Sequence, residues 1–210
     1  VVNGSVKKSR RQFGYNSNFW YPQKGGIREL PLAMCADIKR INLNCEVTRI
    51  DLKKRQIKLA NGLKERFDCL ISTLPLPELG RLISGLPESV LSSFKKLKWN
   101  SIFNLNLGLD GPVGHNRHWV YFPQPDPPFF RVGFFHNFSP YMAPLGKGSL
   151  YAEVSYSKES PLDRAAVSMR VEDDLKRIGV LSGNAARIAV RDTIDIKYGY
   201  PLYDTNYNQA

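Results

Sequence analysis

The chain has 210 residues, of which 42% are hydrophobic, and its 30 basic and 19 acidic side chains give a formal net charge of +11. This length and composition allow one large domain, or one domain and part of a second, with a real core. The longest apolar runs are only a few residues long, whereas a membrane-spanning helix needs roughly 20, so we expect no integral membrane segment.

The N-terminal residues 1–17 are expected to form a loose basic segment, because their charges cluster at 7–11. No apolar stretch follows those charges, so we expect no signal peptide. The other basic residues fall in turns and on helices without a recognisable nucleic-acid-binding motif, and we expect no nucleic-acid partner. A solvated surface is the favoured interpretation. The alternative is long-range attraction of an anionic substrate, a cofactor pyrophosphate or a membrane surface.

The three cysteines, Cys35, Cys45 and Cys69, form no Cys-x-x-Cys pair. We interpret them as buried, reduced thiols, which predicts a cytoplasmic protein and argues against a zinc site. His115 and His118 follow a Gly-Pro-Val-Gly turn, and no nearby cysteine or carboxylate completes a set of ligands. The sequence therefore predicts no metal site.

The first ordered region is expected to begin at residues 19–27, Phe-Trp-Tyr-Pro-Gln-Lys-Gly-Gly-Ile, and to lead into a helix at 28–40. Alternation at 46–50 then predicts an exposed strand. The Gly25-Gly26 pair either passes close to a ligand or forms a tight turn before the helix, since glycine suits both roles.

A β-meander is predicted next. The Asn-Gly pair at 61–62 favours a two-residue hairpin, which folds strands 56–59 and 63–67 against each other. The run Cys-Leu-Ile at 69–71 is uninterrupted and apolar. It predicts a further strand that is buried on both faces.

The second half predicts a mostly antiparallel sheet, because five runs show strand-like alternation or aromatic enrichment between loops with Gly and Pro. A helix pair at 77–84 and 87–98 links the two halves. Another helix should begin at Ser160, where Ser160 caps the free amides and Asp163 meets the positive end of the dipole. The five predicted strands are 103–109, 119–122, 129–135, 149–156 and 185–197, and the predicted apolar side of that helix is Leu162, Ala165, Ala166, Met169, Leu175 and Ile178.

In their order and spacing these elements resemble the flavin-dependent amine oxidase and protoporphyrinogen oxidase superfamily, including its UDP-galactopyranose mutase-like relatives. The resemblance implies that the motif at 21–27, Tyr-Pro-x-x-Gly-Gly-Ile, lies beside the flavin ring, that the strand at 47–50 passes the adenine, and that the apolar strand at 68–74 follows the meander. It implies the following cofactor-binding residues: Gly25, Gly26, Ile27, Val47, Thr73 and Pro75.

The Gly-x-Gly-x-x-Gly turn with which that superfamily begins, and whose helix holds the cofactor pyrophosphate, does not occur in these 210 residues. We therefore expect an α+β portion of a larger enzyme, in which residues 18–76 are part of an FAD-binding domain and residues 77–210 form a substrate-binding domain. The partner is then the rest of its own FAD-binding domain. FAD is expected in the intact protein and not on this chain alone.

Three tyrosines near the C-terminus are the predicted substrate-binding residues: Tyr198, Tyr200 and Tyr203. Tyr198 and Tyr200 alternate along a predicted strand and should project from one face. On periodicity alone a structural pair at a sheet edge is as good an explanation. The resemblance favours a pocket, because this run is similar to the tyrosine-rich segment of the superfamily.

The resemblance implies an FAD-dependent oxidoreductase acting on a small molecule such as an amine, a porphyrinogen-like or a carotenoid-like compound. In such enzymes the flavin carries the redox step, while the protein positions the substrate, and we assign no catalytic residue. One alternative is a flavin-dependent UDP-sugar mutase, which the tyrosine-rich run and the positive charge favour. Another is a binding or scaffold module without catalysis.

Overall fold

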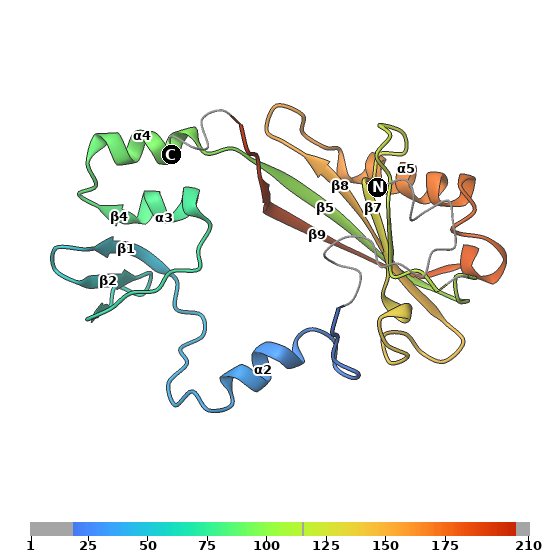
Figure 1. Ribbon diagram of the computed structural model, residues 1–210, viewed down its shortest axis with the longest axis horizontal. Helices are drawn as coiled ribbons and strands as arrows, with labels where there is room; N and C mark the ends of the chain where they lie inside the picture. Colours follow the sequence, from blue (N-terminus) through green and yellow to red (C-terminus); the bar gives the residue numbers. More distant parts are fainter. Residues whose placement is uncertain (1–18, 115, 205–210) are drawn as a thin grey trace.

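The computed structural model describes residues 19–114 and 116–204, which form two lobes, as Figure 1 shows. The smaller lobe holds a four-stranded sheet with helices α3 and α4, and the larger lobe holds a five-stranded sheet with α5 against one face. Helix α2 (Glu29–Cys35) lies apart from both sheets and buries none of its residues. The predicted loose segment 1–17 lies outside the described residues.

The small sheet is the predicted meander with one added strand. Its order is β3-β2-β1-β4, and β1 pairs antiparallel with β2 but parallel with β4. A turn at Asn61-Gly62 joins β2 and β3, but it is not the predicted two-residue turn. The Leu59 amide donates to the Leu63 carbonyl, so the loop encloses residues 60–62, and Gly62 alone of these has a positive φ, of 86°. The bounds are β1 (Val47–Asp51), β2 (Gln56–Leu59), β3 (Lys64–Arg66), α3 (Leu76–Leu82), β4 (Ile83–Ser84) and α4 (Glu88–Lys96).

The large sheet has the order β6-β7-β8-β5-β9, and every neighbouring pair in it runs antiparallel. The predicted mostly antiparallel sheet and the α+β class are thereby confirmed. The bounds are β5 (Trp99–Leu109), β6 (Trp119–Tyr121), β7 (Arg131–Phe134), β8 (Gly148–Tyr156), α5 (Arg164–Arg177) and β9 (Ile188–Pro201), with short 3-10 helices at Phe135–Asn137 and Gly183–Ala186.

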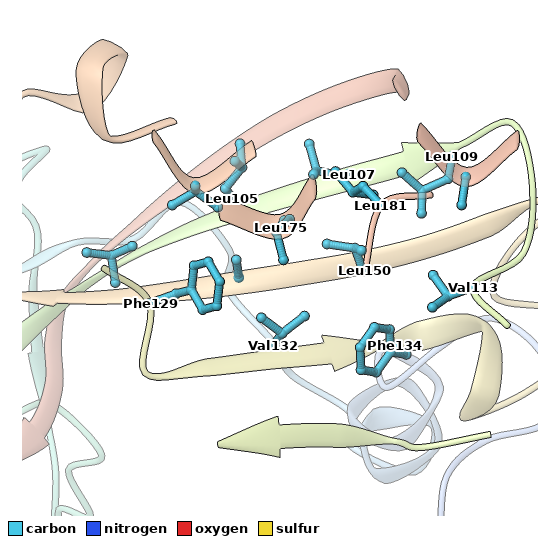
Figure 2. Packing of buried hydrophobic residues seen from close by; sticks show 14 of the residues in the cluster. Leu105, Leu107, Leu109, Val113, Phe129, Val132, Phe134, Leu150, Leu175 and Leu181 are labelled. Carbon is cyan, nitrogen blue, oxygen red and sulfur yellow. The ribbon is translucent and has the colours of Figure 1, made fainter. Parts of the chain in front are cut away.

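The core lies between the large sheet and α5 (Figure 2). Alternate residues of β5, namely Phe103, Leu105 and Leu107, are each 2% exposed or less, as period-two burial requires. From α5, Val171 and Leu175 pack against them and are completely buried. This face anchors the sheet, which leaves its other face available for a site.

The prediction that residues 69–71 form a strand buried on both faces is wrong. The segment has no regular structure, and Leu70 and Ile71 are 39% and 86% exposed. A central strand needs neighbours on both edges and cover on both faces, and no described segment supplies them. The cysteines are free, as expected, but Cys45 and Cys69 are exposed and Cys35 is only partly buried, so their predicted burial is also wrong.

The described α-helices begin or end differently from the prediction. The predicted helix at 77–84 ends at Leu82, because Ile83 and Ser84 pair with β1 as β4, and the predicted helix at 87–98 ends at Lys96. Asp163, not Ser160, caps α5, because its carboxylate accepts hydrogen bonds from the backbone amides of Ala165 and Ala166. The buried side of α5 includes Val167 and Val171, whereas the predicted Met169 is 65% exposed. Helix α2 ends at Cys35, well before residue 40, which agrees with the marginal stability of short helices that lack packing partners.

No helix among the described residues is long and apolar enough to cross a bilayer.

Candidate functional site

A cleft of about 360 Å³ opens where the two lobes meet. One wall comes from the segment that leads into α3, and the other comes from the ends of β5 and β9. Two predicted cofactor residues, Thr73 and Pro75, and two predicted substrate residues, Tyr198 and Tyr200, therefore line the same space. The full lining is Thr73, Pro75, Leu76, Pro77, Leu97, Lys98, Trp99, Tyr198, Gly199, Tyr200 and Pro201.

A bulge in β9 places the tyrosines in this cleft. Asn100 pairs with Tyr200 and Ile102 pairs with Ile196, so residues 197–199 lie opposite Ser101 alone. Ser101 fixes the bulge by donating its hydroxyl to the Lys197 carbonyl at 2.8 Å. Because a bulge changes the direction of the side chains that it carries, the two tyrosines do not simply continue the pleat of β9.

Tyr198 joins the two lobes. Its hydroxyl donates to the Glu78 carboxylate on α3, and the Lys197 ammonium lies 2.5 Å from the same oxygen. The Tyr198 ring also packs on Trp99, with centroids 4.8 Å apart. The hydrogen bonds from Lys197 and Tyr198 lower the pKa of Glu78 to about 2, so Glu78 is a carboxylate at neutral pH.

Tyr200 belongs to a polar cluster on the face of the large sheet opposite α5. Arg131 donates two hydrogen bonds to the Glu153 carboxylate, at 2.6 and 2.7 Å, and others to the hydroxyls of Tyr121 and Tyr200. Burial alone would lower the pKa of Arg131, but the hydrogen bonds to Glu153 and Tyr121 raise it above its ordinary value. Burial raises the pKa of neighbouring Tyr151 to about 12. The Arg131 guanidinium and the Glu153 carboxylate thus form a charged, hydrogen-bonded support for Tyr200.

A second hollow, of about 550 Å³, lies beside the inner face of the small sheet. Val47, a predicted cofactor residue, contributes to it, and Thr73 lines both this hollow and the cleft. Its other walls are mainly apolar and include Ile50 and Ile57 together with the exposed residues Leu70 and Ile71. An elongated ligand with an apolar ring at each end could therefore extend from one space to the other along Thr73.

The other predicted site residues lie elsewhere. Gly25 and Gly26 have φ angles of 76° and 73° and form the turn before α2. Gly26 is buried against Tyr21 and Met142, while Ile27 is 58% exposed. Tyr203 follows β9, is 74% exposed and is not among the residues that line the cleft.

Gly26→Val tests the role of this turn. Because a valine at a φ of 73° is strained by roughly 1–2 kcal/mol, we expect the free energy of unfolding to fall by about that amount in chemical denaturation. The control is Gly114→Val, since Gly114 has no neighbour within 4 Å and no positive φ. Unchanged stability in Gly26→Val, with selective loss of a bound cofactor in the intact protein, would instead favour direct contact with the cofactor.

No group of three or more metal-ligating side chains occurs within residues 19–114 and 116–204. His118 packs edge-on against the Phe19 ring, with centroids 5.0 Å apart. His115, the other histidine considered, lies outside the described residues.

Sequence reasoning missed the polar partners of the tyrosines. Glu78 was assigned only to a linking helix, and Arg131 and Glu153 only to strands. A usable signal did exist, because each of the last two is a charged residue inside an apolar or aromatic run. Charged side chains in such runs are rarely buried unless they are paired. Which carboxylate meets which base depends on the strand order.

One protein family and several solved structures are similar to this chain. The model of the family described as flavin containing amine oxidoreductase matches residues 3–191. A crystal structure of reduced UDP-galactopyranose mutase is similar over 94% of this chain and 45% of that one, with 26% identity and a TM-score of 0.86.

Two further structures share the fold at lower identity. A protein from Exiguobacterium sp. 255-15, provisionally named a protoporphyrinogen oxidase, has 17% identity and a TM-score of 0.67 over 85% of this chain and 40% of its own. Putrescine oxidase bound to putrescine has 15% identity and a TM-score of 0.62 over 81% of this chain and 38% of its own. The present chain thus spans less than half the length of these structures.

Proposed function

The chain belongs to the flavin-containing amine oxidoreductase family, and from this premise we propose that it supplies the substrate side of an FAD-dependent oxidoreductase. The observation that carries the proposal is the cleft of about 360 Å³, where Thr73 and Pro75 on one wall face Tyr198 and Tyr200 on the other. The proposed division is a partial FAD-binding domain at 18–76 and a substrate-binding domain at 77–210. A cytoplasmic location and a small-molecule substrate are parts of the same proposal.

The residues around the cleft fit the ring systems of FAD better than its pyrophosphate. Val47, Thr73 and Pro75 line apolar spaces that suit flat rings, whereas Ile27 is an exposed apolar side chain beside the Gly25-Gly26 turn and lines neither space. A pyrophosphate is usually held by free amides at the start of a helix. The start of α3 borders both spaces but suits a pyrophosphate poorly, because Pro75 and Pro77 have no amide proton and the Glu78 carboxylate adds negative charge there. We therefore propose that these residues, with the Gly25-Gly26 turn, hold only part of the cofactor.

When bound, FAD would supply the electron transfer. The chain's own residues would position the substrate and exclude water. Tyr198 is held by Glu78 and Tyr200 by Arg131, so both rings have fixed orientations before the substrate arrives. Apolar walls such as Leu76 and Trp99 would remove water from the substrate. Preorganised walls of this kind reduce the entropy that binding costs.

A UDP-sugar mutase is the second candidate. The similarity to reduced UDP-galactopyranose mutase, at a TM-score of 0.86 over 94% of this chain, favours it. The polar tyrosine cluster beside the cleft suits a sugar, although Arg131 is already engaged by Glu153. The full-length protein separates the two: oxygen consumption with an amine supports the oxidoreductase, and isomerisation of a UDP-sugar by the reduced protein supports the mutase. A full-length protein that binds no FAD would support a non-catalytic module instead.

Tyr200→Phe in the full-length protein tests the cleft itself. Tyr200 is 47% exposed, so its hydroxyl can serve a substrate, and we expect a loss in kcat/KM equivalent to one hydrogen bond, about 0.5–1.5 kcal/mol. Circular dichroism should stay unchanged. The control is Tyr141→Phe, an exposed tyrosine outside the cleft. Equal activity of both variants on the identified substrate would refute a substrate-binding role for Tyr200.

A further inference from the structure

The outward face of the small sheet carries a row of three positive charges. Arg49 on β1 lies opposite Lys58 on β2, and Lys58 lies opposite Lys64 on β3. Alternation along a strand places next-but-one residues on the same face, so Arg66 belongs to this face too. We call Arg49, Lys58, Lys64 and Arg66, with Lys54 from the adjoining turn, the cationic face.

This arrangement works against the stability of the sheet. Like charges directly opposite each other on neighbouring strands are destabilising. Among the residues that the structure describes, no carboxylate forms an ion pair with any member of the cationic face. Bases on the large lobe behave differently, since Arg164 and Arg191, for example, both pair with carboxylates at 2.7 Å. An unpaired row of charge is better explained by an anionic partner than by the needs of the fold.

The cationic face is exposed to solvent and contains a shallow polar hollow. Its members are all exposed, and four of them line a polar hollow of about 200 Å³ with Asp51, Gln56 and Ile57. Asp51 is the one acid there, and its carboxylate accepts a hydrogen bond from the Lys54 backbone amide at 2.9 Å. The strands β1 and β2 stand at the end of the molecule remote from the large sheet (Figure 1), so this face does not compete with the cleft.

The turn between β1 and β2 adds an apolar group to the charge. Leu52 is 48% exposed at this turn and is followed directly by three basic residues at 53–55. An exposed leucine beside clustered bases is a combination that suits the interface of an anionic bilayer, where charge attracts the protein and the apolar side chain enters the headgroup layer.

We propose that the cationic face, with Leu52, docks the protein peripherally on a membrane surface rich in anionic phospholipid. Nucleic acid fits less well, because this face has no aromatic side chain on which bases could stack and no helix that could enter a groove. The lipid phosphates and carboxylates would supply the negative charge that the row lacks. The inference concerns another surface than the cleft and does not depend on the reaction carried out there.

The test compares two triple variants of the whole chain in sedimentation with vesicles. Arg49→Gln/Lys58→Gln/Lys64→Gln removes the row, and Lys39→Gln/Lys96→Gln/Lys158→Gln removes the same number of exposed charges elsewhere. Vesicles contain phosphatidylcholine alone or with phosphatidylserine. Since each basic residue near such a surface contributes about fivefold to affinity, we expect the row variant to bind phosphatidylserine vesicles about a hundredfold more weakly than the wild-type chain. The control variant should lose much less.

Several results would overturn the proposal: equal losses in the two variants, equal binding to vesicles without phosphatidylserine, or tighter binding to a DNA or RNA duplex or to an acidic protein than to the vesicles. Misfolding is checked separately, because removing the repulsive row should preserve or raise the melting temperature. If the row variant does not fold, Leu52→Ser/Lys54→Gln changes only the turn. It should bind phosphatidylserine vesicles at least fivefold more weakly than the wild-type chain, and unchanged binding would also count against the proposal.

Discussion

Replacing Glu153 by leucine while Arg131 stays in place is expected to lower the free energy of unfolding by about 3–5 kcal/mol. The Glu153 and Arg131 side chains are only 10% and 20% exposed, so the remaining guanidinium could not recover its hydration. It would keep hydrogen bonds to Tyr121 and Tyr200, but neither neutralises its charge. Urea denaturation of the 210-residue chain measures the change.

The double variant Arg131→Met/Glu153→Leu is the matched control. It removes both charges together, and replacement of a buried ion pair by apolar residues of similar size is often neutral. We therefore expect it to recover most of the stability that Glu153→Leu loses. If the single and double variants are equally unstable, Glu153 stabilises the fold through the packing of its side chain and not through its ion pair with Arg131. A single variant as stable as the wild-type chain would mean that water already reaches the pair.

The same residues show how far the sequence could predict this fold. Alternation or aromatic enrichment predicted all five strands of the large sheet, although β5 begins at Trp99 and not at 103, and β9 has no buried residue. The alternation also carries the ion pair, since Arg131 on β7 lies directly opposite Glu153 on β8. However, the pairing of β7 with β8 is a property of the sheet order, and no local pattern encodes it.

The prediction of a strand at 69–71 was wrong because it used the local pattern alone and took no account of neighbouring strands. The apolar run of this segment is the correct signal for a buried strand, but a strand forms only where neighbouring strands complete its hydrogen bonds. The described residues offer none, and the run instead lines the hollow beside the small sheet. Local sequence thus predicted the chemical character of the segment and not its structure. The cap of α5 is a smaller case, in which two suitable residues, Ser160 and Asp163, compete and only the backbone angles decide.

The candidate site was partly predictable. Tyr198 and Tyr200 line the cleft together with Thr73 and Pro75, which agrees with the pocket expected from the family resemblance, while their roles stay predictions. Their hydroxyls diverge, toward Glu78 for Tyr198 and toward Arg131 for Tyr200. Sequence spacing alone implied a simple same-face pair. The bulge opposite Ser101 is the cause of the difference.

Glu78→Gln is expected to weaken the junction between the lobes. The Glu78 carboxylate accepts hydrogen bonds from Lys197 and Tyr198, both about 120 residues away in the chain. Hydrogen bonds to charged groups contribute about 1.5–3 kcal/mol each, and the substituted glutamine would keep a neutral acceptor but lose the charge. The free energy of unfolding should fall by about 1.5–3 kcal/mol, and small-angle scattering should report a larger radius of gyration.

The pH dependence separates this junction from an ordinary surface charge. The pKa of Glu78 is lowered from 4.5 to about 2 in the folded chain. Its contribution is therefore fully present above pH 4.5 and is lost as the pH falls toward 2. Between these values the difference in stability between the wild-type chain and Glu78→Gln should shrink steadily. Glu88→Gln is the control, because Glu88 pairs only with Lys95 on the same helix at 3.5 Å. A difference that stays constant across this pH range, or one that Glu88→Gln reproduces, would mean that Glu78 does not hold the two lobes together.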